Sequence, residues 1–228
     1  MEYIKINSLW KREGWHFDPE KKKSPDYHNG KKFIIGDYSE PEFGNIKKWH
    51  VEEKIDGTNI RLLFKQVDGQ RLLPSIMGRT SAAQIPCHLF SYLQTLATWE
   101  NFDKTFTELK ENDFEVYLFG EGYGPKIQAV GGNYRKDVGF ILFDIMINQW
   151  WLKREDVKSI ADKLSIPMAP SLGIMSEEEV IEFVKSKPLS QASMIPQMME
   201  GVICRSEPLM LFRNGKPMIW KLKCKEFT

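Results

Sequence analysis

The stretch WHVEEKIDGTNIRLLF, residues 49–64, restricts the possible folds more than any other part of the chain. The apolar, β-branched and aromatic residues at both of its ends are typical of buried strands, and we expect these two strands to form a hairpin. The centre of the stretch nevertheless holds the polar side chains of Lys54, Asp56, Asn59 and Arg61. Charged groups in an apolar setting lower stability unless they are paired, so this centre is a candidate functional site.

The composition is that of an ordinary globular protein. Hydrophobic residues are 42% and charged residues 28% of the 228, which excludes a disordered or fibrous chain. The formal net charge is +1, so a site for a polyanion needs a local cluster of Lys and Arg. No apolar run is long enough to cross a bilayer, and the first residues are not typical of a secretory signal, so we expect no membrane partner.

The cysteines indicate a reducing environment. There are three of them, Cys87, Cys204 and Cys224, and none forms a CxxC pair. An odd number without such spacing predicts free thiols and neither a disulfide set nor a zinc site. We therefore expect a protein of the cytoplasm or another reducing intracellular compartment that is not secreted.

Periodicity and turn signals predict a mixed order of strands and helices. Apolar runs predict strands at residues 32–38, 47–55, 59–67, 70–79, 114–124, 137–147, 200–206 and 216–227. Helical spacing predicts helices within residues 88–110, 153–164 and 176–186. Asp68 and Gly69 predict a tight turn, and Ser176 with Glu179 predicts a helix capping box. We expect an α+β fold of mixed, largely antiparallel sheets with flanking helices.

The polar start of the chain is the one candidate for a separate segment. We expect residues 1–41 to be polar and partly mobile, with a solvated basic run at residues 21–23. Residues 42–228 contain no convincing boundary and are expected to form a single domain.

Five polar insertions interrupt the apolar strands, and together they suit the handling of a phosphate anhydride. Side-chain alternation places Lys221 and Lys223 of WKLKCK on one face of a strand. A lysine amine attacks only when unprotonated, which burial or neighbouring cations favour, and Lys54 facing that pair would meet this need. Arg61 and the two later lysines can neutralise charge that develops on phosphorus. A salt bridge between Lys54 and Asp56 would be the structural alternative if the motif stood alone.

A leaving pyrophosphate also needs a divalent ion, and two carboxylates are available to hold one. Glu121 lies in FGEGYG and Glu200 opens EGVICR. Carboxylates that meet phosphate oxygens around Mg²⁺ are the usual arrangement for such a reaction. Glu121 could instead close a strand end by pairing with an arginine, although glycines on both sides favour a closely approaching ligand.

KIDGTNIR, residues 54–61, resembles the K-x-D-G-x-x-x-R motif of the covalent nucleotidyltransferases, which include DNA ligases, RNA ligases and mRNA capping enzymes. GRT, FGEGYG, GFILFDI, EGVICR and WKLKCK resemble the later motifs of this superfamily in the right order. The likeness is closer to ATP-dependent RNA ligases of the type found in T-even bacteriophages and in trypanosome RNA editing. Asp56 departs from that type, which often carries histidine there. The resemblance implies a ligase adenylyltransferase domain, ATP-grasp-like, over residues 42–228.

The resemblance assigns roles to the residues around the first motif. Lys54 would be the nucleophile that becomes adenylated, and Glu53 would lie near the adenine or the ribose. Asn59 would lie on the RNA-facing side of the pocket. Arg61 is the motif arginine of the wider superfamily, which RNA ligases often lack. Arg79 would hold a phosphate of the nucleotide or of the RNA 5′ end.

The resemblance assigns further roles to the later motifs. Glu121 would bind the ribose hydroxyls and Glu200 would support the catalytic metal through water. Phe143 would stack on the adenine ring, although strand alternation does not choose between Phe143 and Phe140. The contacts to the α-phosphate would come from two lysines, Lys221 and Lys223.

The activity implied by the resemblance is that of an ATP-dependent RNA ligase that uses ATP and Mg²⁺ or Mn²⁺. Lys54 would take AMP and pass it to a polynucleotide 5′-phosphate, and a 3′-hydroxyl would then displace AMP. The expected partner is RNA with these ends, as in RNA repair, with DNA possible. The chain ends soon after the last motif, so we expect no OB-fold domain. Alternatives are a minimal DNA ligase, a GTP-using capping-type guanylyltransferase, or a non-catalytic nucleic-acid binding module on the same fold.

Overall fold

The computed structural model describes residues 1–12, 33–80, 82–109 and 113–227. The basic run at residues 21–23 lies outside these residues. The chain divides into two compact units. Unit 1 comprises Met1–Ile4, Ile55–Pro170 and Gln191–Gln197, and unit 2 comprises Lys5–Lys54, Ser171–Ser190 and Met198–Thr228. The boundary expected at residue 41 stays a prediction.

Unit 1 is built on a six-stranded antiparallel sheet. The strand order is β10-β9-β8-β5-β6, and β7 pairs with β5. The strands are β5 (Thr58–Val67), β6 (Gln70–Arg71), β7 (Ser75–Gly78), β8 (Phe114–Tyr123), β9 (Gly139–Ile147) and β10 (Trp150–Trp151). The turn predicted at Asp68 and Gly69 joins β5 to β6, with φ of 50° and 72°, the positive values that such a hairpin turn requires.

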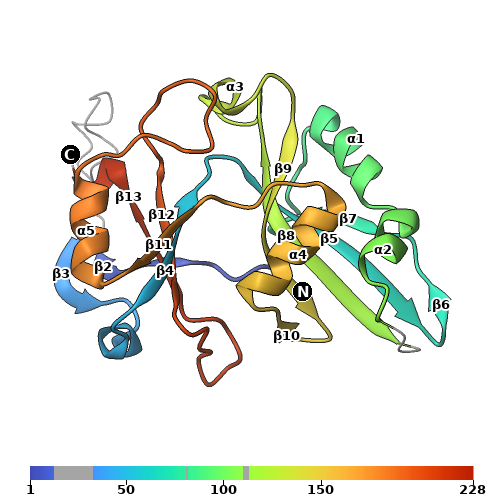
Figure 1. Ribbon diagram of the computed structural model, residues 1–228, viewed down its shortest axis with the longest axis horizontal. Helices are drawn as coiled ribbons and strands as arrows, with labels where there is room; N and C mark the ends of the chain where they lie inside the picture. The colour runs from blue at the N-terminus through green and yellow to red at the C-terminus, as the bar shows by residue number, and fades with distance from the viewer. Residues whose placement is uncertain (13–32, 81, 110–112, 228) are drawn as a thin grey trace. The chain divides into compact units, whose positions relative to one another are not determined.

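Helices cover one face of this sheet (Figure 1). They are α1 (Cys87–Leu96), α2 (Trp99–Thr105) and α4 (Arg154–Leu164), while the short α3 (Gly131–Tyr134) lies in the β8–β9 connection. Apolar side chains of α1, α2 and α4 form one core with the inward side chains of β5, β8 and β9. The polar residues of β5 and β8 alternate with these core positions, so their side chains point to the opposite face of the sheet.

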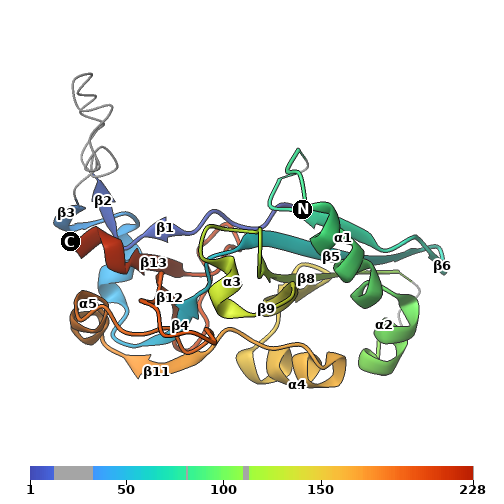
Figure 2. The same cartoon turned by 90° about the horizontal axis from the view of Figure 1, so that it is seen from above.

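Unit 2 is built on a five-stranded sheet in the order β1-β13-β12-β4-β11. The strands are β1 (Asn7–Ser8), β4 (Trp49–Lys54), β11 (Ser171–Met175), β12 (Gly201–Ser206) and β13 (Ile219–Lys223), and only β1 with β13 is a parallel pair. Helix α5 (Glu177–Lys185) begins with the capping box predicted for Ser176 and Glu179. A second sheet pairs β2 (Trp10–Arg12) with β3 (Phe33–Tyr38), and two short 3₁₀ turns span Pro41–Asn45 and Cys224–Phe227. Figure 2 shows the same elements from above.

The predicted α+β class is confirmed, but the hairpin expected over residues 49–64 is wrong. Strand β4 pairs with β12 on one edge and β11 on the other, whereas β5 pairs with β8 and with β6 and β7. Both ends of the stretch are buried, as predicted, and the apolar pattern reports that burial. It carries no information about which distant strand supplies the hydrogen bonds. Among the described residues, no helix has both the length and the apolar character needed to cross a membrane.

Gly201 sets the register at the centre of the unit 2 sheet. It is the cross-strand partner of Lys54 on β4 and of Lys223 on β13. A Cβ atom at this position would lie 2.1 Å from the carbonyl oxygen of Leu222 and 2.7 Å from the Cα of Lys223. Both are backbone atoms that cannot move without opening the β12–β13 pairing, so the position accepts only glycine.

We predict that Gly201→Ala lowers the free energy of unfolding by about 2 kcal/mol or more, because the added methyl group overpacks the strand pair. Urea denaturation measures this change. Gly132→Ala is the control, since its Cβ would meet nothing within 4 Å, and it should not destabilise the protein. Equal stability of the Gly201→Ala variant and the wild type would contradict the close approach of β12 to β13.

Candidate active site

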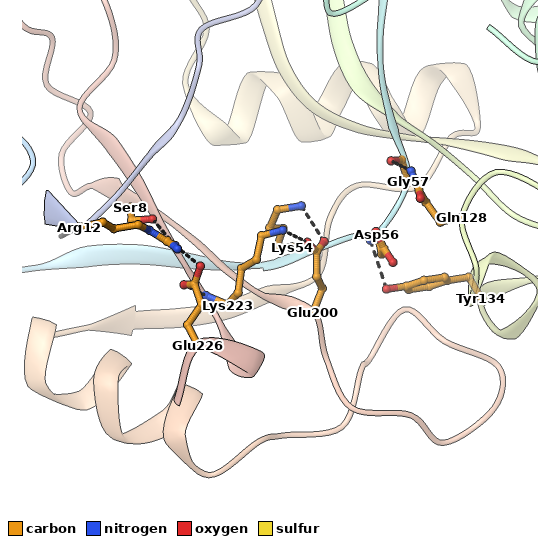
Figure 3. A network of polar contacts seen from close by, with 10 residues as sticks. All are labelled: Ser8, Arg12, Lys54, Asp56, Gly57, Gln128, Tyr134, Glu200, Lys223 and Glu226. Atoms are coloured by element: carbon orange, nitrogen blue, oxygen red, sulfur yellow. Dashed lines mark hydrogen bonds and ion pairs between the residues drawn. The ribbon is translucent and has the colours of Figure 1, made fainter. Parts of the chain in front are cut away.

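Two lysines share the carboxylate of Glu200 (Figure 3). Lys54 Nζ lies 2.6 Å from Glu200 Oε2, and Lys223 Nζ lies 2.7 Å from Glu200 Oε1. The three side chains are only 14% to 26% exposed, so solvent screens these charges weakly. Because Gly201 separates the two lysines in the sheet register, no side chain of β12 stands between them on that face.

The backbone at Lys223 is itself held by a charged pair. Its N–H donates to Glu226 Oε2 at 3.0 Å, and Glu226 forms an ion pair with Arg12. Arg12 also donates to Ser8 Oγ at 3.1 Å. The end of β13 is therefore tied to β1 and β2 on one side as well as to β12 on the other.

Lys221 is the third lysine of this face, as strand alternation predicted. Burial, followed by the nearby charges of Lys54 and Lys223, lowers the pKa of Lys221 to about 8. In the described part of the chain it forms no ion pair, in contrast to the other two lysines. An ammonium group that is desolvated and has no carboxylate partner is suited to bind an anion.

Glu53, which neighbours the nucleophile candidate in sequence, lies on the other face of β4. It is 1% exposed and accepts a hydrogen bond from the hydroxyl of Ser190. The role of Glu53 near an adenine or ribose stays a prediction. The contribution of Ser190 had no sequence signal, because its partner is more than a hundred residues away.

A buried ion pair on the lysine face was also missed. Arg205 Nε donates to Glu52 Oε2 at 2.8 Å, and the two side chains are 4% and 2% exposed. Glu52 shares the face of Lys54, since it lies two residues before it on β4. The spacing of Glu52 and Lys54 was visible in the sequence. It could have indicated that the carboxylate of Glu52 lies on the lysine face and needs a cationic partner.

In unit 1, the structure brings Asn59 and Glu121 together as cross-strand partners on β5 and β8. Asn59 Oδ1 is buried without a hydrogen-bond partner among the described residues. A buried acceptor without a donor is destabilising, and a ligand hydroxyl or amine would relieve this. The roles assigned to the two residues stay predictions, and this geometry is consistent with both.

Arg61 lies near the start of β5, and Arg79 directly follows β7, the strand that pairs with this part of β5. The two arginines differ in environment. Arg61 is 2% exposed, donates through Nε to the carbonyl of Gly78 at 2.7 Å, and donates through Nη1 to the carbonyl of Met1. This guanidinium therefore braces backbone segments, and its catalytic role stays a prediction. Arg79, which follows Gly78, is exposed, so it is accessible to a phosphate group.

Burial separates the two phenylalanines that alternation left open. Phe140 is fully buried in the unit 1 core, whereas Phe143 is partly exposed beside a β-bulge, with its ring 5.0 Å from that of Tyr3. Of the two rings, that of Phe143 is the more accessible, and its stacking on an adenine stays a prediction. The ring of Phe140 fills the space beside Gly120, where a Cβ would lie 2.4 Å from it.

The glycines around Glu121 therefore have a packing reason. Gly120 admits Phe140, and Gly122 admits Leu89, whose Cδ2 would lie 2.5 Å from an added Cβ. The expectation that these glycines favour a closely approaching ligand stays a prediction, since core packing already accounts for both of them.

The described residues supply few metal ligands of their own. They contain no group of three or more His, Cys, Asp or Glu side chains placed to hold an ion. Glu200 belongs to unit 2 and Glu121 to unit 1, so neither unit contains both predicted metal carboxylates. Such a donor set fits a cation that takes most of its ligands from water and from phosphate oxygens, as Mg²⁺ does.

The fold is that of the nucleotidyltransferase domain of RNA ligases. Three structures of an RNA ligase from Naegleria gruberi match 80% of this chain with a TM-score of 0.56: one mutant with ATP and Mn, one form with PPi, and one mutant with AMP and Mn. Sequence identity is 18% to 19%. The chain spans about half the length of these relatives, 51% to 52%.

The profile of the RNA ligase family matches residues 47–223. The chain belongs to this family. A search of curated proteins gave no match. The matched region contains every site residue predicted from the sequence, from Glu53 to Lys223.

The lowered pKa of Lys221 gives a prediction for stability. The folded state disfavours the charged form, so this group destabilises the fold below about pH 8, and the effect fades as the pH rises toward the ordinary pKa of 10.5. Lys221→Met should raise the free energy of unfolding at pH 7 by about 1 kcal/mol, after allowance for solvent screening. Its advantage over the wild type should shrink by pH 10.

Lys223→Met is the matched control for this prediction, because that lysine has an ion pair with Glu200 and its removal should not stabilise the protein. Urea denaturation at both pH values measures the two variants. A Lys221→Met variant less stable than the wild type at pH 7 would show that its charge is compensated.

Proposed function

We propose that this chain is the adenylyltransferase part of an ATP-dependent RNA ligase. The observation that carries the proposal is the shared carboxylate: Glu200 holds Lys54 and Lys223, while Lys221 remains a desolvated cation on the same face. Family membership and the fold support it. The Naegleria structures with ATP and Mn, with PPi, and with AMP and Mn support the cofactors, ATP with Mg²⁺ or Mn²⁺.

The first step is attack of the Lys54 amine on the α-phosphorus of ATP. A P–N bond forms, the bond from the α-phosphorus to the bridging oxygen breaks, and pyrophosphate leaves with that oxygen. The Nζ proton is lost, which yields a lysyl-AMP phosphoramidate. Lys221 and Lys223 would offset the negative charge that develops on the α-phosphate oxygens.

Glu200 has to release Lys54 before this step. Glu200 Oε2 lies 2.6 Å from Lys54 Nζ, so the amine is held against the carboxylate and must turn away from it to reach a phosphorus atom. Glu200 is also the carboxylate expected to support a divalent cation, which when bound would neutralise charge on the leaving pyrophosphate. Glu200 thus has two roles in the proposal, since it holds the amine of Lys54 and would also support the cation.

The nucleic-acid partner we propose is RNA with a 5′-phosphate and a 3′-hydroxyl. AMP would pass from Lys54 to the 5′-phosphate, and attack by the 3′-hydroxyl would then join the strand and release AMP. Arg79 is exposed and Asn59 carries a buried acceptor without a partner, and both suit contacts with the nucleotide or the RNA end. DNA strands are the alternative substrate.

The state of the cysteines supports a reducing intracellular compartment. Among the described residues all three are free, with Cys87 exposed and the other two buried. Burial raises the pKa of the thiols of Cys204 and Cys224, which makes them unreactive.

We predict that incubation with α-labelled ATP and Mg²⁺ transfers a covalent label to the wild type and that Lys54→Arg abolishes it, because the arginine keeps the charge but cannot act as the nucleophile. The label should be lost in acid and survive alkali, as expected of a phosphoramidate. Labelled GTP is the control for the base. A label from GTP alone would replace the ATP assignment with a capping-type enzyme.

The strand preference can be measured with matched nicked duplexes, one with RNA and one with DNA strands at the nick. Sealing should be faster when the strands at the nick are RNA, and a pre-adenylated 5′ end should be sealed by Lys54→Arg, since AMP transfer is then already complete. A gel assay of product length measures this. Faster sealing of DNA strands would assign the protein to DNA repair.

A further inference from the structure

The turn that follows the nucleophile candidate is held by side chains of the β8–β9 connection (Figure 3). The backbone N–H of Asp56 donates to the hydroxyl of Tyr134 at 3.3 Å. Gln128 Nε2 donates to the carbonyl oxygen of Gly57 at 2.9 Å. These bonds hold the backbone on both sides of the Asp56–Gly57 dipeptide, which begins two residues after Lys54.

The segment that precedes Glu200 is held by Asn133, which neighbours Tyr134 in α3. The carbonyl oxygen of Asn133 accepts hydrogen bonds from Ser193 Oγ at 2.8 Å, from Met194 N at 3.0 Å and from Ile195 N at 3.3 Å. Asn133 Nδ2 donates to Gln197 Oε1 at 2.9 Å. Four bonds therefore tie residues 193–197 to one residue of α3.

The two held segments are the ones that lead directly to the interacting side chains. The longest segment of unit 1 begins at Ile55, the residue after Lys54, and the last segment of the unit ends at Gln197, three residues before Glu200. Each residue extends the chain by at most about 3.5 Å. The freedom of Lys54 and of Glu200 is therefore limited by two segments that the same four-residue helix holds.

Packing makes α3 rigid enough for this task. Tyr134 is 3% exposed in a cluster with Ile55, Tyr123 and Ile141. Gly131, at the start of the helix, lies so close to the carbonyl of Gly124 that an added Cβ would be 1.9 Å from it. The tyrosine hydroxyl and the asparagine are thus presented from a fixed backbone.

We propose that Asn133 and Tyr134 are positioning residues, which hold the chain segments that adjoin Lys54 and Glu200 in sequence and so control formation and release of their ion pair. The proposal rests on the function proposed above. Both residues hold neighbouring chain segments through hydrogen bonds, so their loss should slow the chemical step without weakening ATP binding. Misplacement of a reacting group by about 1 Å is enough to lower a rate about 100-fold.

The test compares Tyr134→Phe and Gln197→Leu, which each remove hydrogen bonding to one held segment and retain the apolar bulk. Single-turnover adenylation should slow at least about ten-fold in each variant with KM for ATP unchanged. Hydrogen exchange should speed up at the Asp56 amide in the first variant. In the second it should speed up at the Met194 and Ile195 amides. The double variant should be slowed by less than the product of the single effects, since both act on one ion pair.

Two controls separate positioning from general loosening. Tyr38→Phe also removes a tyrosine hydrogen bond, to Glu177 at 3.0 Å, but lies outside the held segments and should adenylate at the wild-type rate. Gln197→Glu keeps an acceptor for Asn133 Nδ2 and should restore the rate lost in Gln197→Leu.

The outcomes distinguish this proposal from the proposed function. Wild-type adenylation rates in Tyr134→Phe and Gln197→Leu, or slowing that Gln197→Glu does not restore, would overturn the positioning role while leaving the ligase assignment intact. A raised KM with an unchanged maximal rate would also overturn it, since that result indicates ATP contact. A wild type that takes no label from ATP would remove the proposed function itself.

Discussion

The carboxylate of Glu200 is the group on which the proposed site depends. Three lysines on one face of a half-buried sheet repel each other, and two unit charges 4 Å apart interact by about 4 kcal/mol at a near-surface dielectric. Glu200 compensates two of these charges directly, through bonds of 2.6 and 2.7 Å. Lys221 is left without such a partner, and its pKa falls to about 8. The face is therefore short of negative charge, which is the condition an incoming phosphate group would satisfy.

The unit 2 sheet explains how this cluster assembles from three distant parts of the chain. Strand β12 lies between β4 and β13, so residue 201 separates Lys54 from Lys223. Only glycine fits there, because a side chain would collide with the backbone of β13. On the same face the buried pair of Glu52 and Arg205 links β4 to β12 a second time. Charge compensation and strand register thus support each other, and removal of one disturbs the other.

Much of this arrangement was predictable from the sequence, and the failures share one cause. Alternation placed Lys221 and Lys223 on one face, and turn and capping signals gave the β5–β6 hairpin and the start of α5, because these features depend on near neighbours. The hairpin expected for residues 49–64 was wrong because strand pairing is decided by segments far away in sequence. The choice between Phe140 and Phe143 also needed burial, and the hold of α3 on the segment before Glu200 joins side chains and backbone more than fifty residues apart.

The geometry leaves one tension, because the lysine with the lowered pKa is Lys221 while the resemblance assigns the nucleophile to Lys54. In the proposed mechanism Lys221 binds the anion, and Glu200 releases Lys54 when the reaction begins. The most direct measurement is mass spectrometry of proteolytic peptides after incubation with ATP and Mg²⁺. The account predicts that AMP is found on Lys54 alone. AMP on Lys221 would contradict it, because the lysine proposed to bind the phosphate would then be the nucleophile.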